Sequence, residues 1–271
     1  MNLRQHLKFI ARGYLSHARP SPMLIGIIAV GLMTLLDILS SEVTNELERN
    51  QALIAAAQKF METQSNEVYL NAILESQPTL IQGVLSALLS LMVLMVSTGI
   101  VIYIICEARY HKGSVGNLFD ALPILLRVFW YQVISTALVA LWSLLLIVPG
   151  IIALYSYRQG LYILLDHPEM SVMECLRASK HMMKGHKWEA FLLDLSFLGW
   201  SVGQSFAVTT LATAMSAGTA TAGASYLPSL IVLPLTAFIR MYMEFTYFLY
   251  YEHLHGVRYD SRVPDGKPTE G

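Results

Sequence analysis

Six long apolar stretches constrain the fold of this chain more than any other feature of its sequence. They cover residues 23–39, 80–106, 124–148, 151–165, 188–215 and 227–250. A helix needs about 20 apolar residues to cross the roughly 30 Å hydrocarbon core of a bilayer. Only 14 % of the residues are charged, whereas a soluble domain has about a quarter. The sequence therefore predicts an all-α membrane protein, a transmembrane bundle of six helices.

The fourth stretch is the shortest, because residues 151–165 would span only about 22 Å as a helix. Pro149 and Gly150 separate it from the third stretch. A proline nitrogen cannot donate the hydrogen bond that a continuous helix requires, so this pair predicts a turn or a sharp kink. A tight hairpin with its tip in the outer leaflet fits these facts, and a re-entrant loop is the alternative.

The basic residues predict the orientation of the chain in the membrane. With the N-terminus inside, thirteen of the 18 Lys and Arg residues lie in inner segments, two in outer segments and three within the apolar stretches. Cytoplasmic loops carry the excess of Lys and Arg. Both termini are therefore expected in the cytoplasm.

The remaining segments predict one membrane domain with a long outer loop. Residues 1–256 are expected to form this domain, and residues 257–271, which are polar and contain two prolines, a flexible cytoplasmic tail. The outer segment at about 40–78 carries six glutamates, and its apolar residues lie close to helical spacing. One or two amphipathic outer helices are expected there.

Three inner segments are expected to form amphipathic helices at the cytoplasmic membrane surface. They cover residues 3–19, 109–122 and 171–187. In the last, Ser171 and Glu174 match a capping box that begins a helix. Its stripe of Val172, Leu176 and Met183 is expected to face the acyl chains. The residues expected to contact anionic lipid head groups are Arg177, Lys180, Lys184, Lys187 and Trp188.

The part of the chain from 149 to 200 resembles a known family. The residues that carry the resemblance are Pro149, Gly150, Tyr155, Asp166, Pro168, Ser179, Met183, Gly185, His186, Lys187 and the block FLLDLSFLGW at 191–200. They are similar to the bacterial membrane proteins classed as domain of unknown function 975. The resemblance implies a multi-pass protein of the bacterial cytoplasmic (inner) membrane, and it brings no activity with it.

Ionisable residues inside the apolar stretches are the candidate functional residues, because charge in hydrocarbon is costly. Besides Asp37, they form a candidate polar or anion-binding cluster in the cytoplasmic half: Arg127, Arg158, Asp194, Arg240 and Glu244. One interpretation is a set of interhelical ion pairs, with Arg240 as the first partner of Asp194 and Arg158 as the second. Another is a net positive cavity for an anionic ligand, and a third is a proton relay.

The sequence shows no catalytic motif, so no enzymatic activity, cofactor or metal is expected. H-E-x-x-H, G-x-S-x-G and phosphate-binding glycine loops do not occur. A net charge of −1 gives no indication of a nucleic-acid partner. The expected partners are a bilayer with anionic head groups and either another protein or a second copy of the chain. The first hypothesis is a non-enzymatic accessory or scaffold protein. The alternatives are a transporter or exporter of a small anionic or lipid-like solute, and a lipid-modifying intramembrane enzyme.

Overall fold

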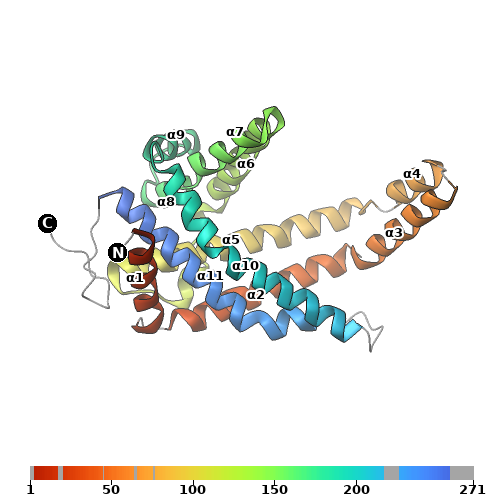
Figure 1. The fold of residues 1–271 in the computed structure, drawn as a ribbon, viewed down its shortest axis with the longest axis horizontal. Helices are drawn as coiled ribbons and strands as arrows, with labels where there is room; N and C mark the ends of the chain where they lie inside the picture. The colour runs from red at the N-terminus through yellow and green to blue at the C-terminus, as the bar shows by residue number, and fades with distance from the viewer. Residues whose placement is uncertain are drawn as a thin grey trace. The chain divides into compact units, whose positions relative to one another are not determined.

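The described part of the chain is helical and has several segments that could cross a membrane. The computed structural model describes residues 3–17, 21–44, 46–63, 66–75, 77–216 and 226–256, and the regular elements within these ranges are all helices (Figure 1). Five of its helical segments are long and apolar enough to span a bilayer: Pro22–Val43, Leu80–Tyr110, Val115–Leu145, Lys187–Met215 and Leu227–Leu254. The chain is thus an all-α protein with the architecture of a multi-pass membrane protein. The predicted tail at 257–271 lies outside the described residues.

The helices follow one another with short connections. In chain order they are α1 (Leu3–His17), α2 (Pro22–Val43), α3 (Glu46–Thr63), α4 (Asn66–Glu75), α5 (Leu80–Tyr110), the 3₁₀ turns η1 (Val115–Leu118) and η2 (Leu122–Ile124), α6 (Leu125–Leu145), α7 (Ile147–Tyr157), α8 (Gly160–Asp166), α9 (Val172–Met182), α10 (Lys187–Ser216) and α11 (Leu227–Leu254).

The contacts divide the chain into two compact units. Unit 1 consists of residues 1–31 and 95–271, and unit 2 consists of residues 32–94, so the division falls within α2 and α5. In unit 2, α3 and α4 pack against each other (Figure 1). They occupy the segment that was predicted to form outer helices. The expectation of one domain over 1–256 stays a prediction.

The core of unit 1 is built around α11. α10 and α1 both pack on this helix. Leu7, Ile10 and Tyr14 recur at helical spacing on α1 and are buried. Tyr14 also stacks on Phe245 of α11, with ring centroids 5.5 Å apart. The apolar face of α1 therefore covers another helix of the protein.

The predicted helix at 109–122 is wrong, because α5 continues to Tyr110 and two 3₁₀ turns follow. His111 has a left-handed backbone conformation that ends α5 (φ 50°). The chain then folds back along α5, and a Cβ atom at Gly99 would lie 2.2 Å from the carbonyl oxygen of Leu118. Only glycine at position 99 allows this approach of the returning chain.

The α6–α7 hairpin turns three residues before the predicted point. Leu146 has an extended backbone (φ −164°, ψ 150°) and separates the two helices. Pro149 lies in the first turn of α7, where backbone N–H groups have no intrahelical acceptor and proline is tolerated. Gly150 meets α6, since a Cβ there would lie 2.1 Å from Ser143 Oγ. The prediction of a break at Pro149–Gly150 is therefore wrong: these residues pack the hairpin together after the turn.

The predicted fourth span is divided between α7 and α8. α7 has 11 residues and α8 has 7, so they rise by about 16 Å and 10 Å. Arg158 and Gln159 separate them. Neither helix alone reaches across a hydrocarbon core of about 30 Å.

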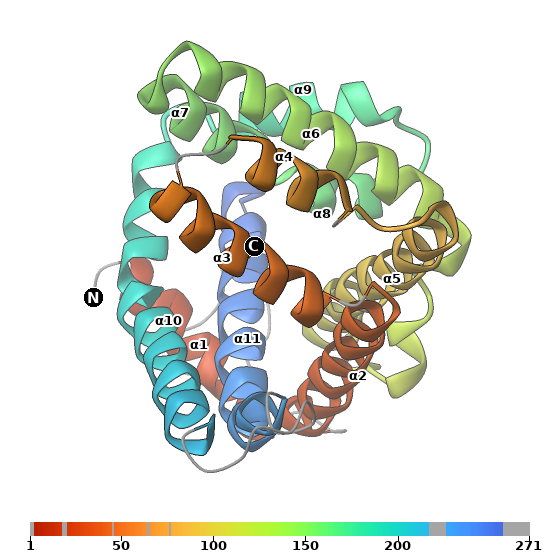
Figure 2. The same ribbon diagram turned by 90° about the vertical axis from the view of Figure 1, so that its right-hand side faces the viewer.

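The α6–α7 hairpin also has an unexpected direction within unit 1. Figure 2 shows α6 running across the view while α10 and α11 run from top to bottom. α6 packs mainly on α7, with further contacts to α8 and α9, and α7 also packs on α10. α6 therefore crosses the direction of these two helices, and the predicted six-helix bundle is not confirmed.

The short helix α9 begins as predicted but faces differently. Ser171 and Glu174 form the capping box, with Glu174 Oε2 2.7 Å from the backbone nitrogen of Ser171. Leu176 and Met183 are buried because α9 packs on α6, α7 and α8. Ser179 Oγ donates a hydrogen bond to the Ser156 carbonyl at 2.8 Å. The prediction that this stripe faces acyl chains is wrong for Leu176 and Met183.

Candidate functional site

The candidate cluster is centred on an ion pair between Arg158 and Asp194. Arg158 ends α7, and Asp194 lies two turns into α10. The guanidinium of Arg158 donates to Asp194 Oδ2, and Tyr155 Oη donates to the same oxygen at 2.9 Å. The guanidinium also lies over the ring of Tyr247 on α11, 4.2 Å from its centroid. The pair therefore connects α7, α10 and α11.

Arg240 does not bind Asp194, although it was the partner predicted first. It lies one helical turn before Glu244 on α11, and the nearest nitrogen and oxygen of these two side chains are 3.9 Å apart. Asp194 instead pairs with Arg158, the partner predicted second. A similar expected depth in the membrane therefore did not identify the partner.

Arg127 lies apart from the cluster. It is near the start of α6, and its guanidinium donates to the backbone carbonyls of Pro168 and Met170. It thereby holds the connection between α8 and α9. The remaining cluster has two arginines and two carboxylates, so the predicted excess of positive charge disappears.

Polar atoms remain without a hydrogen-bond partner in this region. Among the described residues, Asp194 Oδ1, Arg240 Nε and Gln159 Oε1 are buried and unpartnered. The described residues include no group of three or more His, Cys, Asp and Glu that could hold a metal ion.

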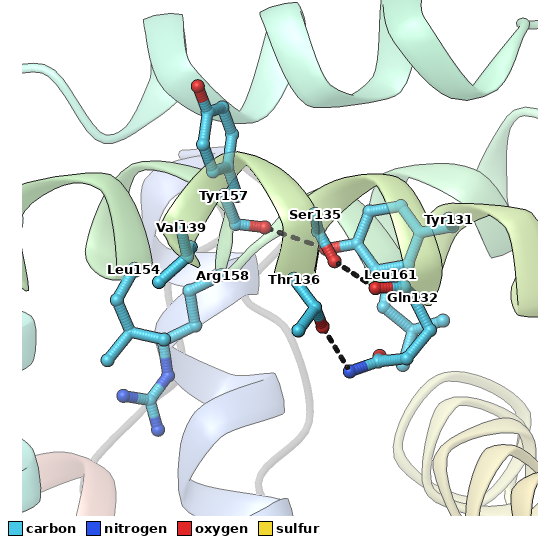
Figure 3. Close-up of a pocket in the computed structure, with 9 residues that line it drawn as sticks. All are labelled: Tyr131, Gln132, Ser135, Thr136, Val139, Leu154, Tyr157, Arg158 and Leu161. Carbon is cyan, nitrogen blue, oxygen red and sulfur yellow. Dashed lines mark hydrogen bonds between the residues drawn. The ribbon is translucent and has the colours of Figure 1, made fainter. Parts of the chain in front are cut away.

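A cavity of about 480 Å³ borders Arg158. It lies between α6 and the α7–α8 segment. Its walls are formed by Tyr131, Gln132, Ser135, Thr136, Val139, Leu154, Tyr157, Arg158 and Leu161. Figure 3 shows the polar ends of Gln132, Thr136 and Arg158 directed to one side of the hairpin. The cavity combines one cation, several neutral polar groups and apolar walls, a lining that suits an amphiphilic molecule.

The predicted head-group residues divide into two groups. Lys180 of α9 and Lys187 at the start of α10 line a second cavity of about 200 Å³, together with Trp142 and Pro149 of the α6–α7 hairpin. Arg177, Lys184 and Trp188 are exposed and do not line it. The structure places all five on the surface of unit 1.

An ionic network in unit 1 joins three helices and could not be predicted from the sequence. Arg109 at the end of α5 binds Asp166 of α8 through two hydrogen bonds of 2.8 and 2.9 Å, and it also binds Glu252 of α11. Tyr251 Oη donates to Asp166 at 2.7 Å. The available signal was a cation and two carboxylates at the ends of three apolar stretches. Nothing in the sequence indicated that these ends meet.

Asp166 is held ionised by this network. Burial disfavours its charged form, but hydrogen bonds from Arg109 and Tyr251 outweigh burial and keep the pKa of Asp166 below its usual value of 3.8. The carboxylate therefore contributes to the stability of the fold as an ion.

The first prediction tests the pairing of Asp194. Asp194→Asn leaves Arg158 without its counter-ion, so we expect a loss of about 3 kcal/mol in the free energy of unfolding. A second change, Arg158→Gln, should recover part of this loss, and Arg240→Gln should not. The measurement is denaturant unfolding of the purified protein in mild detergent. Equal recovery by both second changes would contradict the pairing.

The second prediction concerns acid. Because the pKa of Asp166 is lower in the folded than in the unfolded chain, its contribution is complete above 3.8 and is lost as the pH falls through the folded value. The difference in free energy of unfolding between the native chain and Asp166→Asn should be constant near neutral pH and shrink below about pH 4. Unfolding curves at several pH values measure this difference. A difference that persists unchanged at about pH 2 would refute it.

Comparisons with known proteins give a family but no activity. A search of curated proteins and of solved structures finds no match. The model of the family described as Protein of unknown function (DUF975) matches residues 4–258. This match covers the helices, the ion pairs and both cavities described above. The chain therefore belongs to the DUF975 family.

Proposed function

We propose that this protein is a non-enzymatic accessory or scaffold protein of the bacterial inner membrane, which works by contacting another protein through α3 and α4. The observation that carries this proposal is the apolar surface of these two helices. Ile54, Met61, Leu70 and Leu74 are all more than half exposed, and neither helix is among the candidate spans. Exposed apolar side chains outside a membrane indicate a contact surface.

Charge supports a basic partner. Residues 40–78 carry six glutamates against the two basic residues Arg49 and Lys59. A surface that is apolar and acidic fits a partner protein whose surface is apolar and basic. The membrane-embedded part fits a supporting role, because Arg158, Asp194, Arg240 and Glu244 form two internal pairs without net charge.

We further propose a topology in which α2, α5, α10 and α11 cross the membrane and both termini are cytoplasmic. The α6–α7 hairpin would enter and leave on the cytoplasmic side. Two observations support this. α6 runs across the direction of α10 and α11 (Figure 2). Trp142 and Pro149, near the hairpin tip, share a cavity with Lys180 and Lys187, which belong to the basic segment expected at the cytoplasmic surface.

A second candidate function is the handling of a lipid-like solute, as a transporter or exporter. The cavity beside Arg158 favours it, because its size and mixed lining suit an amphiphile. Its only charged wall residue is already paired with Asp194. For this reason we place this function second.

The third prediction tests the topology. In a chain whose native Cys106 and Cys175 are serines, Glu62→Cys should react with a membrane-impermeant maleimide in intact cells. Lys184→Cys should react only in inverted vesicles. Leu146→Cys at the hairpin tip should remain unlabelled in intact cells, because the tip does not reach the outer surface. Labelling of Leu146→Cys at the level of Glu62→Cys would show that the hairpin crosses.

The fourth prediction tests the contact surface. A photo-crosslinking amino acid at Met61 should give an adduct heavier than the 30.2 kDa chain in living cells. The same probe at Gln58, an exposed polar position of α3, is the control and should give much less adduct. An adduct of twice the chain mass would identify a second copy as the partner. Equal yields at both positions, or no protein adduct at Met61, would refute the proposal.

A further inference from the structure

The second cavity has the features of a phosphate site at the edge of an apolar surface. Its walls come from four helices: Trp142 of α6, five residues of α7, Lys180 of α9 and Lys187 of α10. It differs from the cavity beside Arg158. Ile152 and Ser156 line it from one face of α7, whereas Leu154 and Arg158 line the other cavity from the opposite face. The two cavities share only Tyr157.

The charged residues that line the cavity are both lysines, Lys180 and Lys187. Within the described part of the chain, neither Lys180 nor Lys187 forms a salt bridge. The nearest acidic residues in the sequence are engaged elsewhere. Glu189 contacts His186 at 3.1 Å, and Glu174 accepts hydrogen bonds from Ser171 in the capping box. Two cations from separate helices can therefore bind one anion between them.

Apolar surface continues from the mouth of the cavity along the hairpin. Trp142 is 44 % exposed and Ile152 is 49 % exposed, and Val148 beside them is 65 % exposed. No Asp, Glu, Lys or Arg occurs from Val128 to Tyr157. A free phosphate ion would leave these apolar walls without contact. A phospholipid would place its phosphate at the lysines and an acyl chain along the hairpin.

We propose that Lys180 and Lys187 bind the phosphate of an anionic phospholipid from the surrounding bilayer, with Trp142, Pro149 and Ile152 contacting its glycerol and acyl carbons. The site narrows the five predicted head-group contacts to two that act together. It does not depend on the proposed function, because it involves neither α3 nor α4. Such a lipid would fasten the hairpin to α9 and to the start of α10.

The test compares two double variants, each of which removes two positive charges. The full-length protein, purified in mild detergent, is titrated with phosphatidylglycerol, and native mass spectrometry gives the apparent Kd of the first bound lipid. A lysine close to the head group of a bound anionic lipid contributes about 1 kcal/mol to binding it, so Lys180→Gln with Lys187→Gln should weaken binding about 30-fold. Arg177→Gln with Lys184→Gln removes the same charge from exposed positions outside the cavity. This control should change the Kd by less than about threefold.

Additional measurements distinguish a loss of charge from a loss of folding, and a lipid from a soluble phosphate. Lys180→Arg with Lys187→Arg keeps both cations, so its Kd for the lipid should lie within a few-fold of that of the native chain. This variant is measured in place of the glutamine pair if the glutamine pair does not fold. Soluble glycerol phosphate should not displace the lipid at equal concentration. Equal weakening by both glutamine pairs would show only general surface attraction and would overturn the site. Displacement by glycerol phosphate at equal concentration would overturn the assignment to a lipid.

Discussion

A charge that is taken out of water needs an opposite charge beside it, and this requirement organises unit 1. Arg109 brings the ends of α5, α8 and α11 together, because it binds Asp166 and Glu252 at once. Arg158 joins α7 to α10 through Asp194. Apolar packing alone gives helices in lipid little reason to choose one neighbour, since acyl chains are as apolar as leucine. The ion pairs supply that choice.

The parts of the fold that depend on local sequence could be predicted. Length and hydropathy located the long apolar helices, since a spanning helix must satisfy its own backbone hydrogen bonds. The capping box at Ser171 was also visible, because both of its residues lie within one turn. The family resemblance was confirmed by the match over residues 4–258.

The parts that depend on distant contacts could not be predicted. A proline inside a helix breaks it, whereas a proline in the first turn of a helix is tolerated. Pro149 lies in the first turn of α7 because the chain turns at Leu146, and the sequence near Pro149 does not show where that turn lies. The amphipathic stripe of α9 shows that one face is buried, and nothing local distinguishes burial against lipid from burial against α7 and α8. The partner of Asp194 depended on the crossing of α7 and α10. The depth in the membrane that is expected from the sequence could only reduce the choice to two arginines.

The charge pattern also explains why the number of crossings stays open in a sequence analysis. A hairpin contributes either two crossings or none, so it leaves every later segment on the same side of the membrane. The excess of Lys and Arg in inner segments fits both cases equally. The cavity at Lys180 and Lys187 supports the proposed topology without a crossing, because it brings residues near the hairpin tip to the basic segment. If those lysines face cytoplasmic head groups, a tip that touches them cannot also lie at the outer surface, some 30 Å away. A lipid phosphate bound at these lysines would therefore also place the hairpin tip at the cytoplasmic side of the membrane.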